Sequence, residues 1–310
     1  MGTHSTLEVA GTSVPVSNLE KVYYPNAGFR KGDVLDYYVR ISSVLLPHLK
    51  DRPITLKRYP DGVDGIHFYE KHCPSHRPSW IRTKAVAKAK GGEVTYCVLN
   101  NLSALIWAAN LANLELHTFL HKARALTRPT VLAFDLDPGP PADLLSCCEI
   151  GLMLRDLFTT LRLKSYPKTS GSKGLQVYVP LNRATTYDRT KQFSRAVAET
   201  LEQQAPDKVV SRMQKSLRHG KVLVDWSQND DHKTTVCVYS LRATDQPRVS
   251  TPLKWQEVET ALRRGKASLL HFEPGAVLKR VAREGDLFSE VLTVRQKLPN
   301  GRRDFGAKAP

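Results

Sequence analysis

Hydrophobic and polar residues alternate along this chain with two periods, which predict short strands interspersed with helices. An apolar stripe at helical spacing, Val34–Leu45, predicts a helix that follows Asp33 and ends at Pro47. The next stretch, Arg52–Arg58, alternates as a strand with Lys57 on the face opposite the apolar one. Lys57 is therefore expected to be held on a rigid element.

The rest of the chain shows the same mixture of elements. Helices are expected at residues 102–112, around 154–161, at 193–201, 255–264 and 274–292, and strands at 114–121, 131–137, 164–181 (two strands around a loop), 221–226 and 234–243. A Gly- and Lys-rich stretch, 84–92, is expected to be a mobile basic loop, and 302–310 a polar end. These elements predict a protein of class α+β whose second half forms a compact lobe.

Size and composition limit the class of protein. At 310 residues, the chain exceeds the usual size of one domain, so we expect two lobes or two small domains. Hydrophobic residues make up 41% and charged residues 25%, and no apolar run approaches the roughly 18 residues of a membrane span. The amino terminus lacks a secretory pattern, which favours a cytoplasmic protein.

The five cysteines are odd in number and show no metal-ligand or redox spacing. We therefore expect buried or incidental thiols in a reducing compartment. His72, Cys73 and His76 would suggest zinc, but a fourth ligand at suitable spacing is missing, so polar surface residues explain this group adequately.

The net charge of +16, with 46 Lys and Arg residues against 30 acids, favours a polyanionic partner, most simply nucleic acid. Basic clusters at 84–90 and 212–218 support such a footprint. The alternative is a basic solvated surface without a specific partner.

Two acids at the end of an apolar run form the strongest candidate site. In Val131-Leu-Ala-Phe-Asp-Leu-Asp-Pro-Gly139, Asp135 and Asp137 are two residues apart, so a strand would project both carboxylates from one face. Asp225 ends a second apolar strand. Three such carboxylates can hold two Mg²⁺ or Mn²⁺ ions, which suit phosphoryl transfer. The alternative for Asp137 is a turn former, because Asp-Pro-Gly is itself a strong turn signal.

A loop rich in small residues is a candidate for phosphate binding. Lys168-Thr-Ser-Gly-Ser-Lys-Gly174 offers backbone N–H groups, the hydroxyls of Ser170 and Ser172, and the charge of Lys173. It lacks the spacing of a Walker A loop, and alone it is equally compatible with a flexible hairpin.

Taken in order, the runs Phe-Asp-Leu-Asp-Pro-Gly, Thr-Ser-Gly-Ser-Lys-Gly and Val-Asp-Trp-Ser-Gln resemble the polymerase domain of bacterial DNA ligase D. That family belongs to the archaeo-eukaryotic primase superfamily and works in non-homologous end joining. The resemblance extends from Val16 to about Leu292. It implies a two-lobed α+β primase-polymerase fold in one domain, 1–300, with an N-terminal α/β lobe of about 1–110, an RRM-like catalytic lobe of about 111–295, and a polar tail at 296–310.

The resemblance also implies roles for individual residues. The metal-binding catalytic acids would be Asp135, Asp137 and Asp225. The residues expected to contact the incoming nucleotide are His117, Ser170, Lys173, Gln176, Arg242, Lys57 and Gln228. The residues expected to contact DNA are Asn18, Lys21 and Lys31 at a 5′-phosphate across a gap, Phe68 and Tyr69 on template bases, and Arg218 in the basic cluster. As alternatives, Asn18 could cap a turn and a lone strand histidine could be structural.

The chain departs from the family at one position. Where the family has a histidine after Ser-Lys-Gly-x, this sequence has Gln176. Glutamine can donate an amide hydrogen to phosphate but cannot become cationic or shuttle a proton. Weaker triphosphate binding or an altered activity is therefore expected.

The expected function is template-directed nucleotidyl transfer that extends DNA 3′ ends and fills short gaps at double-strand breaks, with a preference for ribonucleotides. The cofactors would be two Mn²⁺ or Mg²⁺ ions, and the substrate an NTP or dNTP. Expected partners are DNA with gaps, overhangs or broken ends bearing a 5′-phosphate, the end-binding protein Ku and a DNA ligase, in the bacterial cytoplasm at the nucleoid and without a membrane. The alternatives are a DNA-end bridging module with little catalysis and a stand-alone primase.

Overall fold

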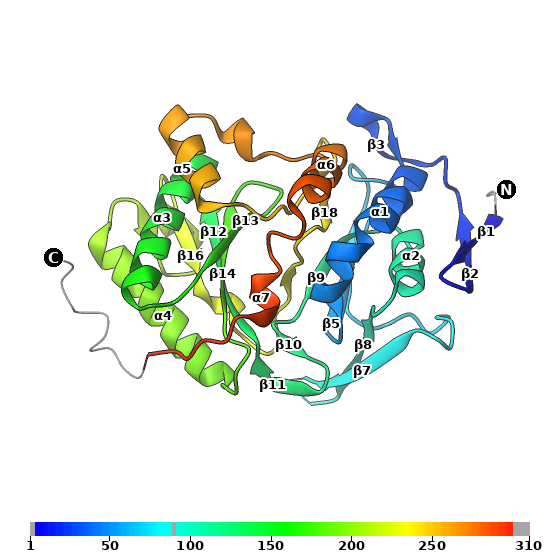
Figure 1. Cartoon of the computed structure of the whole chain (residues 1–310), viewed down its shortest axis with the longest axis horizontal. Helices are drawn as coiled ribbons and strands as arrows, with labels where there is room; N and C mark the ends of the chain where they lie inside the picture. Colours follow the sequence, from blue (N-terminus) through cyan, green and yellow to red (C-terminus); the bar gives the residue numbers. More distant parts are fainter. Residues whose placement is uncertain (1–3, 89–90, 300–310) are drawn as a thin grey trace. The chain divides into compact units, whose positions relative to one another are not determined.

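The computed structural model describes residues 4–88 and 91–299 and divides the chain into two compact units (Figure 1). Unit 1 consists of Met1–Arg124, Thr234–Ser250 and Phe272–Asp286, and unit 2 of Ala125–Lys233, Thr251–His271 and Leu287–Pro310. The sequence suggested lobes that follow one another and meet near residue 110, whereas these units are interleaved along the chain. The tip of the expected basic loop, 89–90, and the polar end from residue 300 lie outside the described residues.

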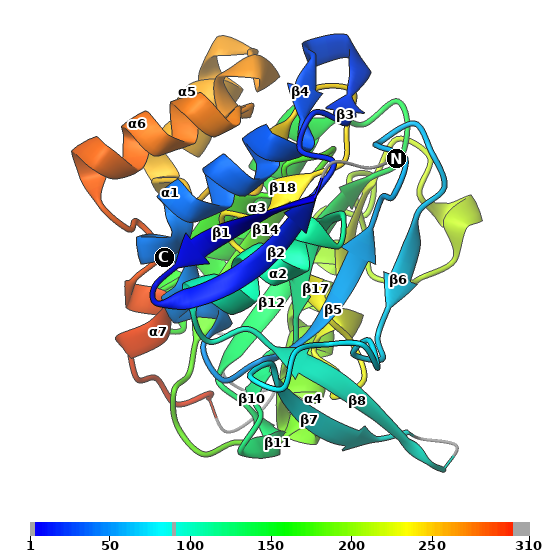
Figure 2. The ribbon, with the colours of Figure 1, turned by 90° about the vertical axis from the view of Figure 1, so that its right-hand side faces the viewer.

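A six-stranded sheet forms the centre of unit 1, in the order β17-β9-β5-β8-β7 with β6 also paired to β5. Its strands are β5 (Pro53–Arg58), β6 (Phe68–Glu70), β7 (Arg82–Ala87), β8 (Glu93–Val98), β9 (Asn113–Thr118) and β17 (Thr235–Val236). The strands of this unit that lie outside the central sheet are β1 (His4–Val9), β2 (Thr12–Ser17), β3 (Val22–Tyr24), β4 (Phe29–Arg30), β10 (His121–Lys122), β18 (Leu241–Arg242) and β19 (Arg248–Val249). The helices are α1 (Lys31–Leu49), α2 (Leu102–Asn110), α6 (Pro274–Glu284) and the 3₁₀ turn η1 (Pro25–Ala27). The hairpin of β7 and β8 projects from this sheet (Figure 2).

Helix α1 buries the apolar stripe that predicted it, but the prediction that Pro47 ends the helix was wrong. Proline inside a helix removes one backbone hydrogen bond and crowds the preceding turn, at a cost of about 3 kcal/mol. His48 and Leu49 are both buried and continue the packed face beyond the proline. Packing therefore extends the helix to Leu49.

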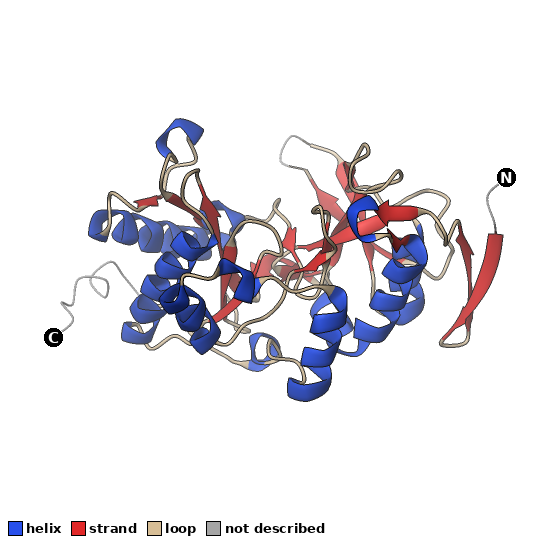
Figure 3. Cartoon of the chain, turned by 90° about the horizontal axis from the view of Figure 1, so that it is seen from above, coloured by secondary structure: helices blue, strands red, loops and turns tan. Residues whose placement is uncertain are grey.

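Unit 2 is built on a five-stranded sheet in the order β13-β14-β12-β16-β15. Its strands are β12 (Val131–Pro138), β13 (Tyr166–Thr169), β14 (Leu175–Pro180), β15 (Val209–Val210) and β16 (Val222–Asp225), preceded by β11 (Ala125–Pro129). The helices are α3 (Leu144–Thr160), α4 (Tyr187–Gln204), α5 (Trp255–Arg264), α7 (Glu290–Thr293) and the 3₁₀ turns η2 (Lys215–Leu217), η3 (Trp226–Gln228) and η4 (Ala267–Leu270). Helices α3 and α4 both pack against this sheet (Figure 3).

The packing of α3 decides which face of β12 carries the core. The ring of Phe134 lies 5.4 Å from the ring of Phe158 on α3, and the Leu136 carbonyl accepts a hydrogen bond from the Cys147 thiol at 3.4 Å. Since side chains alternate along a strand, the odd-numbered residues of β12 point away from α3. The core thus lies on the even-numbered face, and the candidate acids lie on the other.

Two expected elements are interrupted where the backbone adopts a positive φ. The helix expected at 274–292 ends at Glu284, because Gly285 has φ 68°, and a separate short helix follows at Glu290. The strand expected at 234–243 is split into β17 and β18, because Tyr239 between them has φ 64°. Both predictions of one continuous element were wrong.

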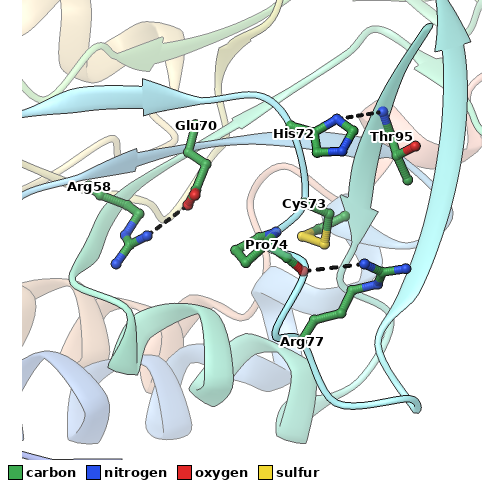
Figure 4. Close-up of a disulfide and its surroundings, with 8 residues drawn as sticks. Arg58, Glu70, His72, Cys73, Pro74, Arg77 and Thr95 are labelled. Atoms are coloured by element: carbon green, nitrogen blue, oxygen red, sulfur yellow. Dashed lines mark hydrogen bonds and ion pairs between the residues drawn. A yellow bond between two sulfur atoms is a disulfide. The ribbon is translucent and has the colours of Figure 1, made fainter.

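Cys73 and Cys97 form a disulfide (Figure 4), so the expectation that all five cysteines are thiols was wrong. Backbone pairing brings the two segments together, since Cys73 N donates to Thr95 O at 2.6 Å. The cysteines are 24 positions apart, a separation that carries no recognisable signal in the sequence. The bonded Cys73 is not available as a zinc thiolate. The remaining thiols are buried, as expected: Cys147, Cys148 and Cys237.

Within residues 4–88 and 91–299, no helix combines the length and the apolar character needed to cross a bilayer.

Candidate active site

A row of four polar residues crosses the sheet of unit 2. Asp135 on β12 lies opposite Asp225 on β16 and opposite Gln176 on β14. Gln176 in turn lies opposite Lys168 on β13. Residues directly opposite each other in a sheet project from the same face. The row therefore joins three predicted site residues to Lys168, for which the sequence had suggested no individual role.

The centre of this row carries concentrated negative charge. Burial, together with the neighbouring carboxylates of Asp137 and Asp225, raises the pKa of Asp135 to about 6, against the opposing effects of a hydrogen bond from Gln176 and the charge of Lys168. Lys168 is fully buried, with its ammonium 5.5 Å from the centre of the Tyr178 ring. A buried carboxylate whose pKa is raised in this way would be stabilised in its charged form by a bound cation.

Asp225 and Asp137 each have hydrogen-bonding or ionic partners of their own. Asp225 accepts hydrogen bonds from Ser227 N at 2.8 Å, Ser227 Oγ at 2.6 Å and Gln228 Nε2 at 3.0 Å. Asp137 Oδ2 lies 3.7 Å from Nη1 of Arg218. Two residues predicted to contact the nucleotide or DNA, Gln228 and Arg218, thus contact the candidate acids themselves.

These side-chain orientations bear on metal binding. Across the described ranges, no three His, Cys, Asp or Glu side chains are arranged closely enough to hold a metal ion. Asp225 is turned toward Ser227 and Asp137 toward Arg218, so metal binding would require both carboxylates to reorient. The donor set itself fits hard cations, because three carboxylates lie on two adjacent strands and the pKa of Asp135 is raised.

The expected phosphate loop joins β13 to β14 and is held together by hydrogen bonds among its own residues. Ser170 Oγ accepts hydrogen bonds from Ser172 N at 3.2 Å and from Gly174 N at 3.1 Å. A Cβ on Gly174 would lie 2.1 Å from the Leu136 carbonyl oxygen, so the loop can lie this close to β12 only with glycine there. Lys173 is exposed. The loop is therefore a compact turn packed against the strand of the acids, with one ammonium group facing solvent.

In unit 1, three predicted nucleotide-binding residues meet at a buried carboxylate to which the sequence analysis had assigned no role. Glu115 is 1% exposed, and its Oε2 lies 2.9 Å from His117 Nε2 and 3.6 Å from Lys57 Nζ. Its Oε1 lies 3.3 Å from Arg242 Nε. The signal in the sequence was the spacing of two between Glu115 and His117, which places both on one face of a strand. We call Lys57, Glu115, His117 and Arg242 the Glu115 cluster.

A second basic group lies where α1 begins. Lys31 is 4% exposed, and burial together with Lys21 and Arg58 lowers its pKa to about 8. Lys31 N donates to Lys21 O at 2.8 Å, and Lys21 Nζ pairs with Asp61 at 2.7 Å. Asn18 has φ 54° and its carbonyl accepts from Lys21 N at 3.0 Å, so it forms a turn, as the alternative held. That turn brings Lys21 and Lys31 together.

Phe68 and Tyr69 on β6 are exposed aromatic residues, 41% and 54% respectively. The Arg58 guanidinium lies 5.4 Å from the centre of the Phe68 ring, and Lys57 Nζ lies 5.3 Å from that of Tyr69. Exposed rings beside cations are typical of surfaces that stack nucleic-acid bases.

Comparison with known proteins agrees with the resemblance found in the sequence. The family model "LigD, primase-polymerase domain" matches residues 30–288. The multifunctional non-homologous end joining protein LigD of Mycolicibacterium smegmatis is 41% identical over 89% of this chain and 36% of its own length. The bifunctional non-homologous end joining protein LigD of Bacillus subtilis is 32% identical over 79% of this chain and 39% of its own length. The chain thus spans little more than a third of these relatives.

A solved structure, the polymerase domain from Mycobacterium tuberculosis ligase D in complex with DNA, has a TM-score of 0.83 with 36% identity, over 91% of this chain and 98% of that one. The expected α+β primase-polymerase fold is thereby confirmed. Both the family model and the fold place this chain in the LigD primase-polymerase domain family, whose relatives are named as non-homologous end joining proteins.

Proposed function

We propose that this chain is a template-directed polymerase that extends DNA 3′ ends and fills short gaps at double-strand breaks, with a preference for ribonucleotides. The observation that carries the proposal is the placement of Asp135 opposite Asp225, with Asp137 on the same face of the same strand. A nucleotidyltransferase needs such a group of acids to hold the cations that would neutralise the charge of the reacting phosphate. Family membership supports the reaction class.

In this proposal, Asp135, Asp137 and Asp225 hold two Mn²⁺ or Mg²⁺ ions. When bound, such ions lower the pKa of the primer 3′-hydroxyl and neutralise the triphosphate. Asp225 is the carboxylate assigned to the side of the attacking oxygen. Gln228 holds Asp225 through a hydrogen bond, and Gln176 does the same for Asp135.

The remaining residues bind the substrates. The loop with Ser170 and Lys173 offers phosphate contacts, and His117, Lys57 and Arg242 offer a cationic cluster for the triphosphate. For DNA, the proposal assigns a 5′-phosphate across the gap to Asn18, Lys21 and Lys31, template bases to Phe68 and Tyr69, and a backbone contact to Arg218. Ku and a DNA ligase are the proposed protein partners, as expected for a part of end joining.

The test is extension of a labelled gapped duplex with a 5′-phosphate, in Mn²⁺ and in Mg²⁺. The wild type, Asp137→Ala and Gln176→His are compared, with Asp207→Asn as the control because Asp207 is an exposed acid elsewhere in unit 2. We expect incorporation by the wild type and by the control. Asp137→Ala should incorporate nucleotide at least about a hundredfold more slowly, as is typical when a catalytic group is removed. Gln176→His should have a lower KM for NTP. Undiminished incorporation by Asp137→Ala would contradict the mechanism.

One observation favours a second candidate, a DNA-end bridging module. The exposed side chains of Phe68, Tyr69 and Lys21 offer DNA contacts that need none of the acids. Duplex binding by wild type without incorporation would support this candidate and reject the polymerase. Product on an unprimed template would identify a stand-alone primase instead.

A further inference from the structure

Glu115 is a buried charge that the proposed chemistry does not use directly. Its carboxylate is 1% exposed and accepts hydrogen bonds from Tyr59 Oη at 3.2 Å and from Ala243 N at 3.1 Å, in addition to its contacts with His117, Lys57 and Arg242. A buried carboxylate is costly to desolvate and is kept only where several partners compensate it. Glu115 has partners on both oxygens, so it is a fixed anchor for what surrounds it.

The charges of the Glu115 cluster do not balance. One carboxylate faces the cations Lys57 and Arg242, with His117 as a third when it is protonated. A neighbouring pair in the same unit, Arg58 and Glu70, is matched one to one at 2.9 Å. The excess of positive charge in a largely buried group is typical of a functional site, where an anionic substrate supplies the missing charge.

We propose that Glu115 is a positioning residue that holds His117, Lys57 and Arg242 together in one orientation, as one recognition group for a nucleoside triphosphate. This inference rests on the proposed polymerase function. Glu115 itself does not touch the substrate in this scheme. Its carboxylate fixes the three side chains that do.

The hydrogen bond from His117 explains how the anchor works. With Glu115 ionised, His117 Nε2 carries a hydrogen and donates it to Oε2 at 2.9 Å. The other ring nitrogen, Nδ1, then meets a phosphate oxygen as a donor only if His117 takes up a second proton. Glu115 supports that protonated form, because a carboxylate beside an imidazolium stabilises it.

The protonation of Lys57 depends on the same anchor. Burial lowers the pKa of Lys57 and of His117, Glu115 raises both, and Arg242 lowers both. The groups that face His117 are Glu115 from its own strand, Lys57 from β5, Tyr69 from β6 and Arg242 from β18; its partner on β17 is Val236, which carries no charge. Without the carboxylate, His117 and Lys57 would both lose their protons at lower pH.

The test separates positioning from folding by pH. The variants are Glu115→Gln, which keeps the shape and removes the charge, and Glu115→Asp, which keeps the charge and shortens the arm. The matched control is Asp286→Asn, because Asp286 also accepts a 2.9 Å contact from a buried histidine, His48, in the same unit. For each protein, KM for NTP and kcat are measured from pH 6 to pH 9 on a primed gap, and ATP binding with Mn²⁺ is measured by calorimetry.

For Glu115→Gln we expect KM and the ATP dissociation constant to rise about tenfold at pH 8, where Lys57 without its carboxylate partner loses its proton more readily, with most of the loss recovered at pH 6, where Lys57 is protonated in both proteins. Saturating NTP should restore kcat to within about twofold, since only binding of the ground-state triphosphate is weakened. Glu115→Asp should raise KM at every pH by the same factor, so that its pH profile matches that of the wild type. If Glu115→Gln does not fold, Glu115→Asp provides the test. Asp286→Asn should leave both KM and its pH profile unchanged.

Two results would overturn the inference: wild-type ATP affinity in Glu115→Gln at pH 8, or an equal loss at every pH. The failure of the polymerase proposal is distinguishable from these. If the wild type binds ATP but incorporates no nucleotide, the polymerase is rejected, while calorimetry still decides the role of Glu115.

Discussion

Replacing Asp135 by asparagine should stabilise the metal-free protein at neutral pH, even though it is expected to abolish nucleotide incorporation. The change removes a carboxylate whose pKa is raised from 3.8 to about 6, first by burial and then by Asp137 and Asp225. Asparagine keeps the shape and can still accept the hydrogen bond from Gln176. What disappears is the repulsion among three acids on adjacent strands.

The sign follows from the two protonation states. Below about pH 4, Asp135 is protonated in both the folded and the unfolded chain, so the substitution changes little. Between pH 4 and 6 the unfolded chain loses this proton first, so folding stability falls as the pH rises through that window. Above pH 6 the full cost of the ionised carboxylate is present. The advantage of Asp135→Asn should therefore grow from pH 4 to pH 6 and then stay level.

The magnitude follows from the size of the shift. A shift of about two pKa units corresponds to about 3 kcal/mol, and partial exposure of Asp135 to solvent reduces this to about 1 to 2 kcal/mol. The measurement is urea unfolding followed by tryptophan fluorescence, in the presence of a chelator, at pH 4.5, 6 and 7.5. Asp207→Asn serves as the control for loss of an exposed acid. Adding Mn²⁺ should stabilise the wild type more than Asp135→Asn, because the ion binds only where the acids are complete.

The reasoning is refuted if Asp135→Asn is less stable than the wild type at pH 7.5 without metal. It is equally refuted if the difference in unfolding free energy is the same at pH 4.5 and pH 7.5, since the effect would then not come from ionisation.

Three further predictions concern other parts of the chain. Gly174→Ala should cost about 2 kcal/mol or more in urea unfolding, because its Cβ would lie 2.1 Å from Leu136 O; a change below about 0.5 kcal/mol would contradict this. Cys73→Ser should lower the free energy of unfolding by about 3 kcal/mol, because the bond to Cys97 closes a loop of 24 positions. It should also make unfolding insensitive to dithiothreitol. Alkylation of five thiols in the untreated, denatured wild type would contradict this prediction. The preference for a 5′-phosphorylated gap should weaken between pH 7 and 9, because Lys31, with a pKa lowered to about 8, loses its proton in that range. The measurement is the ratio of gap-filling rates with and without the 5′-phosphate. A ratio that does not change with pH would argue against a role for Lys31.

The sequence predicted best those elements whose own periodicity is strong. Strand β12 and helix α4 lie where the apolar pattern put them, because each buries one face along its whole length. Helix α1 was ended too early at Pro47, because a local rule about proline was outweighed by burial of the residues that follow it. Long-range packing is invisible in a local pattern.

In the candidate site, too, local features could be predicted from the sequence and long-range ones could not. The spacing of Asp135 and Asp137 predicted a shared face, and the structure confirms it. The pairing of Asp135 with Asp225 depends on strand register across a separation of 90 positions. The local pattern predicts that each acid ends an apolar strand, but it does not predict which residues of the two strands lie opposite each other. The Thr-Ser-Gly-Ser run that follows Lys168 predicts that a loop begins there. In the structure Lys168 lies within strand β13 and is fully buried.

The interleaving of the two units has a consequence for synthesis on the ribosome. Unit 1 needs Thr234–Ser250 and Phe272–Asp286, so its sheet lacks β17 until most of the chain has emerged. At roughly 5 to 20 residues per second, the wait between β9 and β17 is on the order of ten seconds. During that interval the edge of β9 that later pairs with β17 is unpaired, which leaves its backbone N–H and C=O groups open to pairing with other chains. Neither unit can mature before the other is almost complete, so both acquire their candidate functional residues within the same short period.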